Sequence, residues 1–317
     1  MNHILVGSDI LTPVSVNKVT TGKGADTFDI YGGTNTLNSG KGNDEINLYE
    51  GHNTVKASAG NNIITIGKDG MDSESMRNSV TTGKGKDSFK IQNSYNAINS
   101  GAGNDLFEIV SVMKADGFTP TTSYNIINSG KGNDRFDISS GTNNIQGGVG
   151  NDTYIIKDGG LNTVIKDSKG NDTYDFSNVS TYDNIVTISD TKGKNTLVLD
   201  ELKEFYFDVK LNKKGKGVAG NNIVFTDLNN SNLNTGINIT GRKAISSVQV
   251  ESGEVGVYEA YKFDSAVINE ITQNVAGWLK ENDYKSTAEV FNNEKQDGDI
   301  ADLLTLYADT ADAYIMK

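Results

Sequence analysis

The stretch Gly147-Gly148-Val149-Gly150-Asn151-Asp152-Thr153-Tyr154-Ile155 decides the fold. It joins a glycine-rich turn to an Asp, and an apolar residue follows two positions later. The same position is held by Asp or Asn at nine-residue steps, with two longer steps, through much of the chain. These residues are Asn17, Asp26, Asn35, Asp44, Asn53, Asn62, Asn78, Asp87, Asn96, Asp105, Asn125, Asp134, Asn143 and Asp152. Slightly longer steps continue the series at Asn162, Asp172, Asn184 and Asn195.

Apolar residues also recur at a spacing of two, as in Phe28/Ile30 and Phe136/Ile138, which predicts short strands with one inward face. Asp and Asn alternate along the series, so two nine-residue steps make one 18-residue coil with two strands and two turns. We therefore predict an all-β solenoid: a parallel β-roll of 18-residue coils stacked about 4.8 Å apart. One edge carries the Asp turns, and the other carries Asn amides that can hydrogen-bond along the stack.

The Asp turns read G-x-G-x-D, and their glycines can turn backbone carbonyls toward a shared centre. Stacked carboxylates and carbonyls would form an all-oxygen cage, whose flexible geometry favours calcium over magnesium. The alternative is that both edges hold only polar turns, with Gly and Asn chosen for their backbone geometry.

The repeat resembles the nonapeptide G-G-x-G-x-D-x-U-x of RTX calcium-binding proteins, and the resemblance covers about residues 17–200. It implies carboxylate ligands from Asp26, Asp44, Asp87, Asp105, Asp134, Asp152 and Asp172. It implies carbonyl ligands from Gly22, Gly24, Gly40, Gly42, Gly83, Gly85, Gly101, Gly103, Gly130, Gly132, Gly148 and Gly150. Only one edge keeps the Asp turns, so we expect a single row of roughly five calcium ions. Asn62 interrupts this row, and Ser168 and Lys169 weaken the turn before Asp172.

The chain divides into a lead-in at 1–16, the roll at 17–200, a β-rich cap at 201–262 and a helical segment at 263–317. Apolar spacing predicts helices that begin at Asp264 or Ser265, at Ser286 and at Asp299. The resemblance implies that the tail is an uncleaved signal for type I secretion from a bacterium. The partners would then be calcium and the type I secretion machinery, and the location would be extracellular. The start of the chain is a poor signal peptide.

Composition narrows the function further. There are 29 basic and 41 acidic residues, a net charge of −12, which argues against binding nucleic acid. Cysteine is absent, so disulfides cannot stabilise a secreted form, whereas bound metal can. No nucleophile elbow, HExxH motif or P-loop is present, and His52 reads as a turn residue. We expect a chain without enzymatic activity.

Two insertions, between Asn62 and Asn78 and between Asp105 and Asn125, should emerge on the same side of the roll, two coils apart. Inserted loops on one face of a solenoid often mark its binding face, although neutral variation of loops is the simpler alternative. Three functions fit: a calcium-responsive module that folds after export, a surface-binding protein such as an adhesin or surface-layer component, and the targeting module of a toxin. A host or bacterial cell surface would be a further partner.

Overall fold

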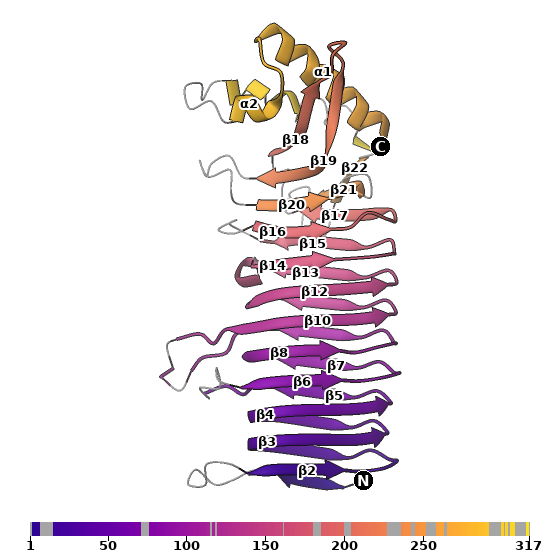
Figure 1. The fold of residues 1–317 in the computed structure, drawn as a ribbon, viewed down its shortest axis with the longest axis vertical. Helices are drawn as coiled ribbons and strands as arrows, with labels where there is room; N and C mark the ends of the chain where they lie inside the picture. The colour runs from indigo at the N-terminus through magenta and orange to yellow at the C-terminus, as the bar shows by residue number, and fades with distance from the viewer. Residues whose placement is uncertain are drawn as a thin grey trace. The chain divides into compact units, whose positions relative to one another are not determined.

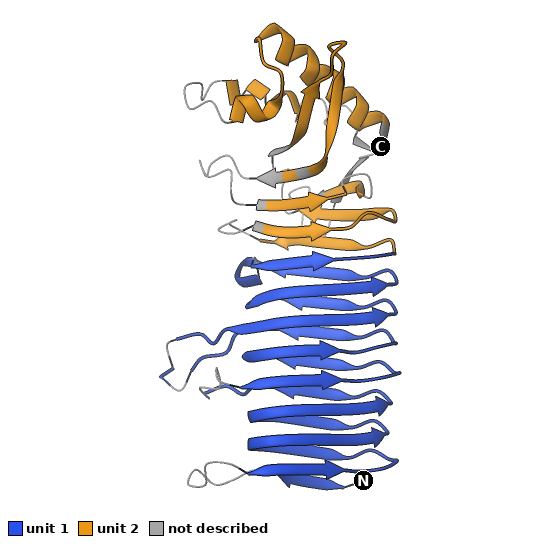
Figure 2. Cartoon of the chain, in the orientation of Figure 1, with its two compact units in different colours: residues 1–169 blue, residues 170–317 orange. Residues whose placement is uncertain are grey.

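The computed structural model shows a long β-solenoid of parallel strands, as predicted (Figure 1). It describes residues 2–6, 15–70, 76–114, 116–117, 119–160, 162–179, 185–199, 204–226, 236–241, 245–251, 258–262, 265–291, 299–300, 302–303, 305–307 and 315–316. The chain forms two compact units, residues 1–169 and 170–317 (Figure 2), and each is considered by itself below.

Each coil of the first unit contributes one strand to each of two rows. The strands that follow the Asp turns form the aspartate sheet: β1 (His3–Val6), β3 (Thr27–Lys41), β4 (Glu45–Ala59), β5 (Ile63–Ile66), β7 (Ser88–Ile91), β9 (Leu106–Ile109), β11 (Arg135–Ile138) and β13 (Thr153–Lys157). The other row is the asparagine sheet: β2 (Val16–Thr20), β3 from Thr34, β4 from His52, β6 (Arg77–Thr81), β8 (Ser94–Asn99), β10 (Ser123–Lys131), β12 (Thr142–Val149) and β14 (Thr163–Lys166). A short 3-10 helix, Asp158–Gly160, precedes β14.

The register places each apolar residue on its counterpart in the next coil. Phe89 pairs with Phe107, Phe107 with Phe136, and Phe136 with Tyr154. Their rings stack with centroids 4.8, 4.8 and 4.9 Å apart, and all four side chains are fully buried. Burying each such side chain contributes roughly 2–3 kcal/mol, so the period-two pattern is the source of the core.

Asn side chains form a buried ladder beside the asparagine sheet. The Asn96 amide nitrogen donates to Oδ1 of Asn125 at 2.9 Å, and Asn125 donates in turn to Oδ1 of Asn143 at 2.7 Å. The same bond links Asn17 to Asn35, Asn35 to Asn53, Asn53 to Asn78 and Asn78 to Asn96. An amide suits this column because it carries both a donor and an acceptor.

The glycines of the Asp turns permit close stacking of the coils. At Gly132 φ is +133°, and a Cβ there would lie 1.6 Å from the carbonyl oxygen of Gly103 in the preceding coil. A side chain at this position would therefore force the coils apart.

In the second unit, β15 (Thr173–Asn178) pairs in parallel with β17 (Asn195–Leu199). The strands β20 (Gly236–Thr240) and β21 (Ile245–Glu251) pair in parallel with β16 (Ile185–Ser189) and β17, so parallel pairing within this unit continues beyond residue 200. Between them, β18 (Glu204–Leu211) and β19 (Gly217–Thr226) form an antiparallel hairpin.

The last part of this unit has two short strands, β22 (Tyr258–Lys262) and β23 (Ile315–Met316), and the helices α1 (Ser265–Glu281) and α2 (Thr287–Phe291). Helix α1 lies against β18 and β19. Ser286 precedes α2 and accepts the N–H of Glu289 at 3.3 Å, as expected of an N-cap. Asp264 lies outside the described residues. Neither described helix is long and apolar enough to cross a membrane.

Replacing Asn125 with Ala should lower the free energy of unfolding by about 2–3 kcal/mol, because it removes the acceptor of one Asn96 N–H and the donor to the buried Oδ1 of Asn143. Asn128→Ala is the control, since Asn128 lies on the same strand but is exposed, and it should change stability by less than about 0.5 kcal/mol. Urea unfolding measures both. Equal effects of the two variants would contradict a structural role for the ladder.

Candidate metal centre

The carboxylates of the Asp turns form one buried column in the first unit, which we call the aspartate column. Its members are Asp26, Asp44, Asp87, Asp105, Asp134 and Asp152, each between 1 and 3% exposed. Asn62 occupies the corresponding place in the coil between Asp44 and Asp87. Asp172, the seventh predicted carboxylate ligand, is also buried and directly precedes Thr173, the first residue of β15.

One oxygen of each carboxylate is used by the backbone of the neighbouring coil. The N–H of Asp87 donates to Oδ1 of Asp105, and the N–H of Asp105 donates to Oδ1 of Asp134, both at 2.8 Å. The same bond runs from Asp26 to Asp44 at 3.0 Å and from Asp134 to Asp152 at 2.8 Å. At the end of the column, Asp26 accepts both the backbone and the side-chain nitrogen of Asn2 at 2.8 Å.

The second oxygen is different. Oδ2 of Asp44, Asp87, Asp105 and Asp134 is buried and has no hydrogen-bond partner among the described residues. No described ion pair reaches these four carboxylates; those of the first unit join His3 to Asp29 and Arg135 to Asp137. A buried carboxylate oxygen without a partner carries a large desolvation cost, so each turn presents an unsatisfied acceptor.

The electrostatics of the column follow from this burial. Burial raises the pKa of Asp105 to about 6; the N–H of Asp87 opposes the shift, and the charges of Asp134 and Asp87 add to it. Burial also raises the pKa of Asp134. For Asp26, burial is outweighed by the hydrogen bonds from Asn2, and the pKa is lowered. The carboxyl groups of Asp105 and Asp134 therefore resist ionisation, whereas that of Asp26 at the end of the column does not.

A second column, which we call the hydroxyl column and which was not predicted from the sequence, lies next to the carboxylates. It consists of small side chains five residues before each Asp or Asn of the aspartate column: Thr21, Ser39, Ala57, Thr82, Ser100, Ser129 and Gly147. The hydroxyl of Ser100 donates to the carbonyl of Ser129 at 3.0 Å, and that of Ser129 donates to the carbonyl of Gly147 at 2.6 Å. Because a hydroxyl has one proton, these bonds leave the neighbouring Oδ2 atoms unsatisfied. The fixed offset of five residues was the signal for this column.

The predicted carbonyl ligands have structural roles of their own. The carbonyl oxygens of Gly22, Gly83 and Gly101 accept the N–H groups of Lys41, Ala102 and Lys131 at 2.8, 2.8 and 3.0 Å. The carbonyl of Gly148 accepts the N–H of Lys169 at 3.1 Å. The carbonyl of Gly148 also accepts the hydroxyl of Ser168, whereas those of Gly22, Gly83 and Gly101 each keep one further lone pair for a metal.

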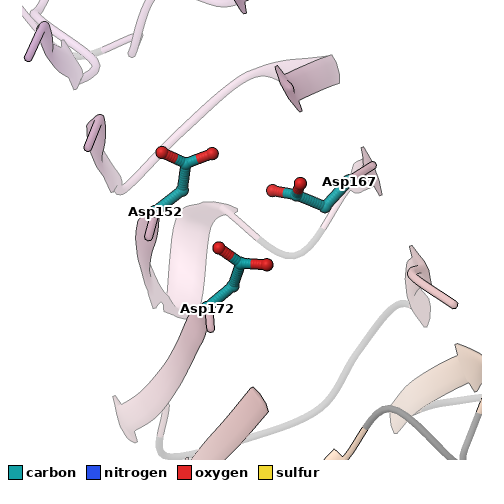
Figure 3. A group of neighbouring side chains, drawn as sticks. All are labelled: Asp152, Asp167 and Asp172. Carbon is teal, nitrogen blue, oxygen red and sulfur yellow. The ribbon is translucent and has the colours of Figure 1, made fainter. Parts of the chain in front are cut away.

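Three acidic side chains lie close together next to Gly147, the last member of the hydroxyl column. Oxygen atoms of Asp152, Asp167 and Asp172 lie within 4.8 Å of one another (Figure 3), so this group could hold a metal ion. Oδ2 of Asp167 accepts the hydroxyl of Tyr154 at 2.6 Å. Gly147 makes room for both, since a Cβ there would lie 1.9 Å from the Tyr154 hydroxyl and 2.5 Å from Asp167. Asp167 precedes Asp172 by five residues, the offset of the hydroxyl column, but the sequence analysis did not single it out.

The second unit repeats the Tyr–Asp pair. The hydroxyl of Tyr174 donates to Oδ2 of Asp190 at 2.8 Å, and the amide of Asn195 donates to the same oxygen at 2.6 Å. Asp190 precedes Asn195 by five residues. Direct hydrogen bonds thus satisfy the carboxylate at this turn, where the sequence carries Asn195 in place of the Asp of the metal-binding pattern.

Comparison with protein-family models, with curated proteins and with solved structures finds no match to this chain.

The raised pKa of Asp105 predicts an unusual pH dependence in chelator. Because the pKa in the folded chain lies above the unfolded value of about 3.9, the stabilisation is complete below pH ~4 and is lost as pH rises through about 6. The free energy of unfolding of the metal-free protein should therefore rise by on the order of 1 kcal/mol, through this group, when the pH is lowered from 7 to 5.

Thermal unfolding in chelator across this range measures the effect. Asp105→Asn should flatten the dependence while keeping an acceptor for the N–H of Asp87, as Asn62 does for Asp44. A melting temperature that falls steadily from pH 7 to pH 5, equally in both proteins, would contradict the raised pKa.

Proposed function

We propose that this chain is a calcium-binding module of the RTX type, which folds when its aspartate column binds the ion. The observation that carries the proposal is the series of buried Oδ2 atoms without partners on Asp44, Asp87, Asp105 and Asp134. Turn propensity alone would explain the glycines, but it would not explain acidic side chains held away from water at regular steps.

A hard cation fits this arrangement. The available donors are carboxylate, hydroxyl and carbonyl oxygens, with no nitrogen or sulfur ligand in the column, and such donors suit calcium or magnesium. Calcium is favoured because it accepts irregular oxygen geometry, whereas magnesium requires a near-octahedral shell. The carboxylate oxygens of the aspartate column, with Ser100 and Ser129 beside them, would hold the ions in one row.

Such a column would make folding depend on the calcium concentration around the chain. Where calcium is scarce, the like charges of the column repel one another and oppose the folded state. Where calcium is abundant, ions bind the folded chain and not the unfolded one, which stabilises the fold by mass action. This logic suits a non-enzymatic module that leaves a bacterium unfolded by type I secretion and folds outside, as part of a toxin or a surface protein.

Asp134→Asn tests the proposal because its effect on stability should change sign between chelator and calcium. In chelator at pH 7.5 the variant should be as stable as the parent chain or more so, because one buried charge is removed while the N–H of Asp105 keeps an acceptor. In millimolar calcium it should be less stable by about 1–3 kcal/mol and should bind less calcium.

Asp137→Asn is the matched control, since Asp137 pairs with Arg135 at the surface and should show no such reversal. Circular dichroism and thermal unfolding follow stability, and calorimetry counts the bound ions. A β-sheet signal and melting temperature that do not respond to calcium would rule out the mechanism.

We propose a surface-binding protein, such as an adhesin or surface-layer component, as a second candidate. Its support is that the two insertions meet: the N–H of Gly70 donates to the carbonyl of Met113 at 3.0 Å. They directly precede β6 and β10, which lie on either side of β8. Shortening both insertions should abolish attachment to cells while leaving calcium binding unchanged; retained attachment would exclude a role for these loops.

A further inference from the structure

The outer face of the asparagine sheet has an unusual charge for this chain. The exposed residues of β2, β6, β8, β10, β12 and β14, and of β3 from Thr34 and β4 from His52, include no Asp or Glu. Exposed basic residues on this face include Lys18, Lys56, Arg77 and Lys166. Because the whole chain carries −12, this face differs sharply from the average surface and is suited to an anionic partner.

A groove of about 500 Å³ lies on this face over β6, β8, β10 and β12. Tyr95 and Tyr124 line it with stacked rings, centroids 4.8 Å apart and planes 9° apart. The Arg77 guanidinium lies over the other face of Tyr95, 4.5 Å from the ring centroid. Ile126, Thr142 and Asn144 contribute further to the lining, and Ile126 is 65% exposed.

Arg77 is available to a ligand. Among the described residues no carboxylate pairs with it, and stacking on Tyr95 holds the guanidinium while leaving its N–H groups free to meet an anion. The strands around it use their backbone groups to pair with each other, so recognition on this face depends on side chains alone. These side chains are tyrosines, amides, hydroxyls, one arginine and the aliphatic side chains of Ile126 and Val164.

We propose that this groove binds an anionic polysaccharide. Sugar rings combine apolar C–H faces with hydroxyl groups, and they match tyrosines set among Asn and Thr side chains. Acidic groups on the polymer pair with Arg77, and the described strands of this face present no exposed Asp or Glu to repel them. A repeating polymer also suits a surface whose residues recur from coil to coil. The site is on the asparagine sheet and is independent of the aspartate column.

The probe is hyaluronan, a polysaccharide with a carboxylate in each repeat, tested by affinity electrophoresis with the full chain in calcium-containing buffer. The parent chain should be retarded, and Arg77→Gln and Tyr124→Ala should each weaken binding roughly tenfold. Asn144→Trp fills the groove without removing a tyrosine and should also abolish retardation. Tyr31→Ala is the control, because Tyr31 is an exposed tyrosine whose ring packs at a tilt against that of Tyr49 and does not line the groove.

Neutral dextran tests whether binding requires negative charge on the polymer, and polyglutamate tests whether binding requires sugar rings. Neither polymer should retard the chain. Circular dichroism confirms that each variant is folded. Absence of retardation by hyaluronan, equal retardation by polyglutamate or dextran, or unchanged binding in the folded variants would overturn the proposal. Self-association in sedimentation that is lost in Arg77→Gln would also overturn it, by identifying a second copy of the chain as the partner.

Discussion

The constraint behind the whole structure is that coil stacking places each side chain beside its own counterpart. For Phe89, Phe107 and Phe136 this is favourable, because flat apolar rings stack and exclude water. For Asn it is also favourable, because each amide donates to the next and accepts from the previous one. For Asp it is unfavourable, because a carboxylate only accepts and its neighbours carry the same charge.

The aspartate column answers this problem only in part. Backbone N–H groups satisfy one oxygen of each carboxylate, and the hydroxyls beside them donate elsewhere. One turn relieves the repulsion, because Asn62 removes a charge and still accepts the N–H of Asp44. This departure shows that the fold can be built with fewer free carboxylate oxygens. The remaining Asp residues therefore do not follow from the stability of the fold alone.

Much of the architecture was predictable, because the nine-residue period that sets the stacking of the coils is visible in the positions of residues such as Asp134, Asn143 and Asp152. The buried column, the amide ladder and the apolar register all follow from it. Two kinds of feature did not follow. The roles of Asp167 and Ser129 depend on which hydroxyl donates to which oxygen, and the meeting of Gly70 with Met113 depends on loop paths that no period describes. The first depends on the orientation of single hydroxyl groups and the second on loop packing, and neither is determined by the nine-residue period.

The two edges of the coil tolerate change unequally, and this difference has a physical reason. Both insertions fall on the path to the asparagine sheet, where they lengthen the step between successive coils from 18 residues to 25 and 29. The backbone bond to the next side chain in the column is nevertheless 2.8 Å at both places. The turns before the aspartate column keep their length, because an added residue would move a carboxylate out of line with its neighbours. Loops can vary at one edge because the other edge holds the register, and an ion row needs that register more than a hydrophobic core does.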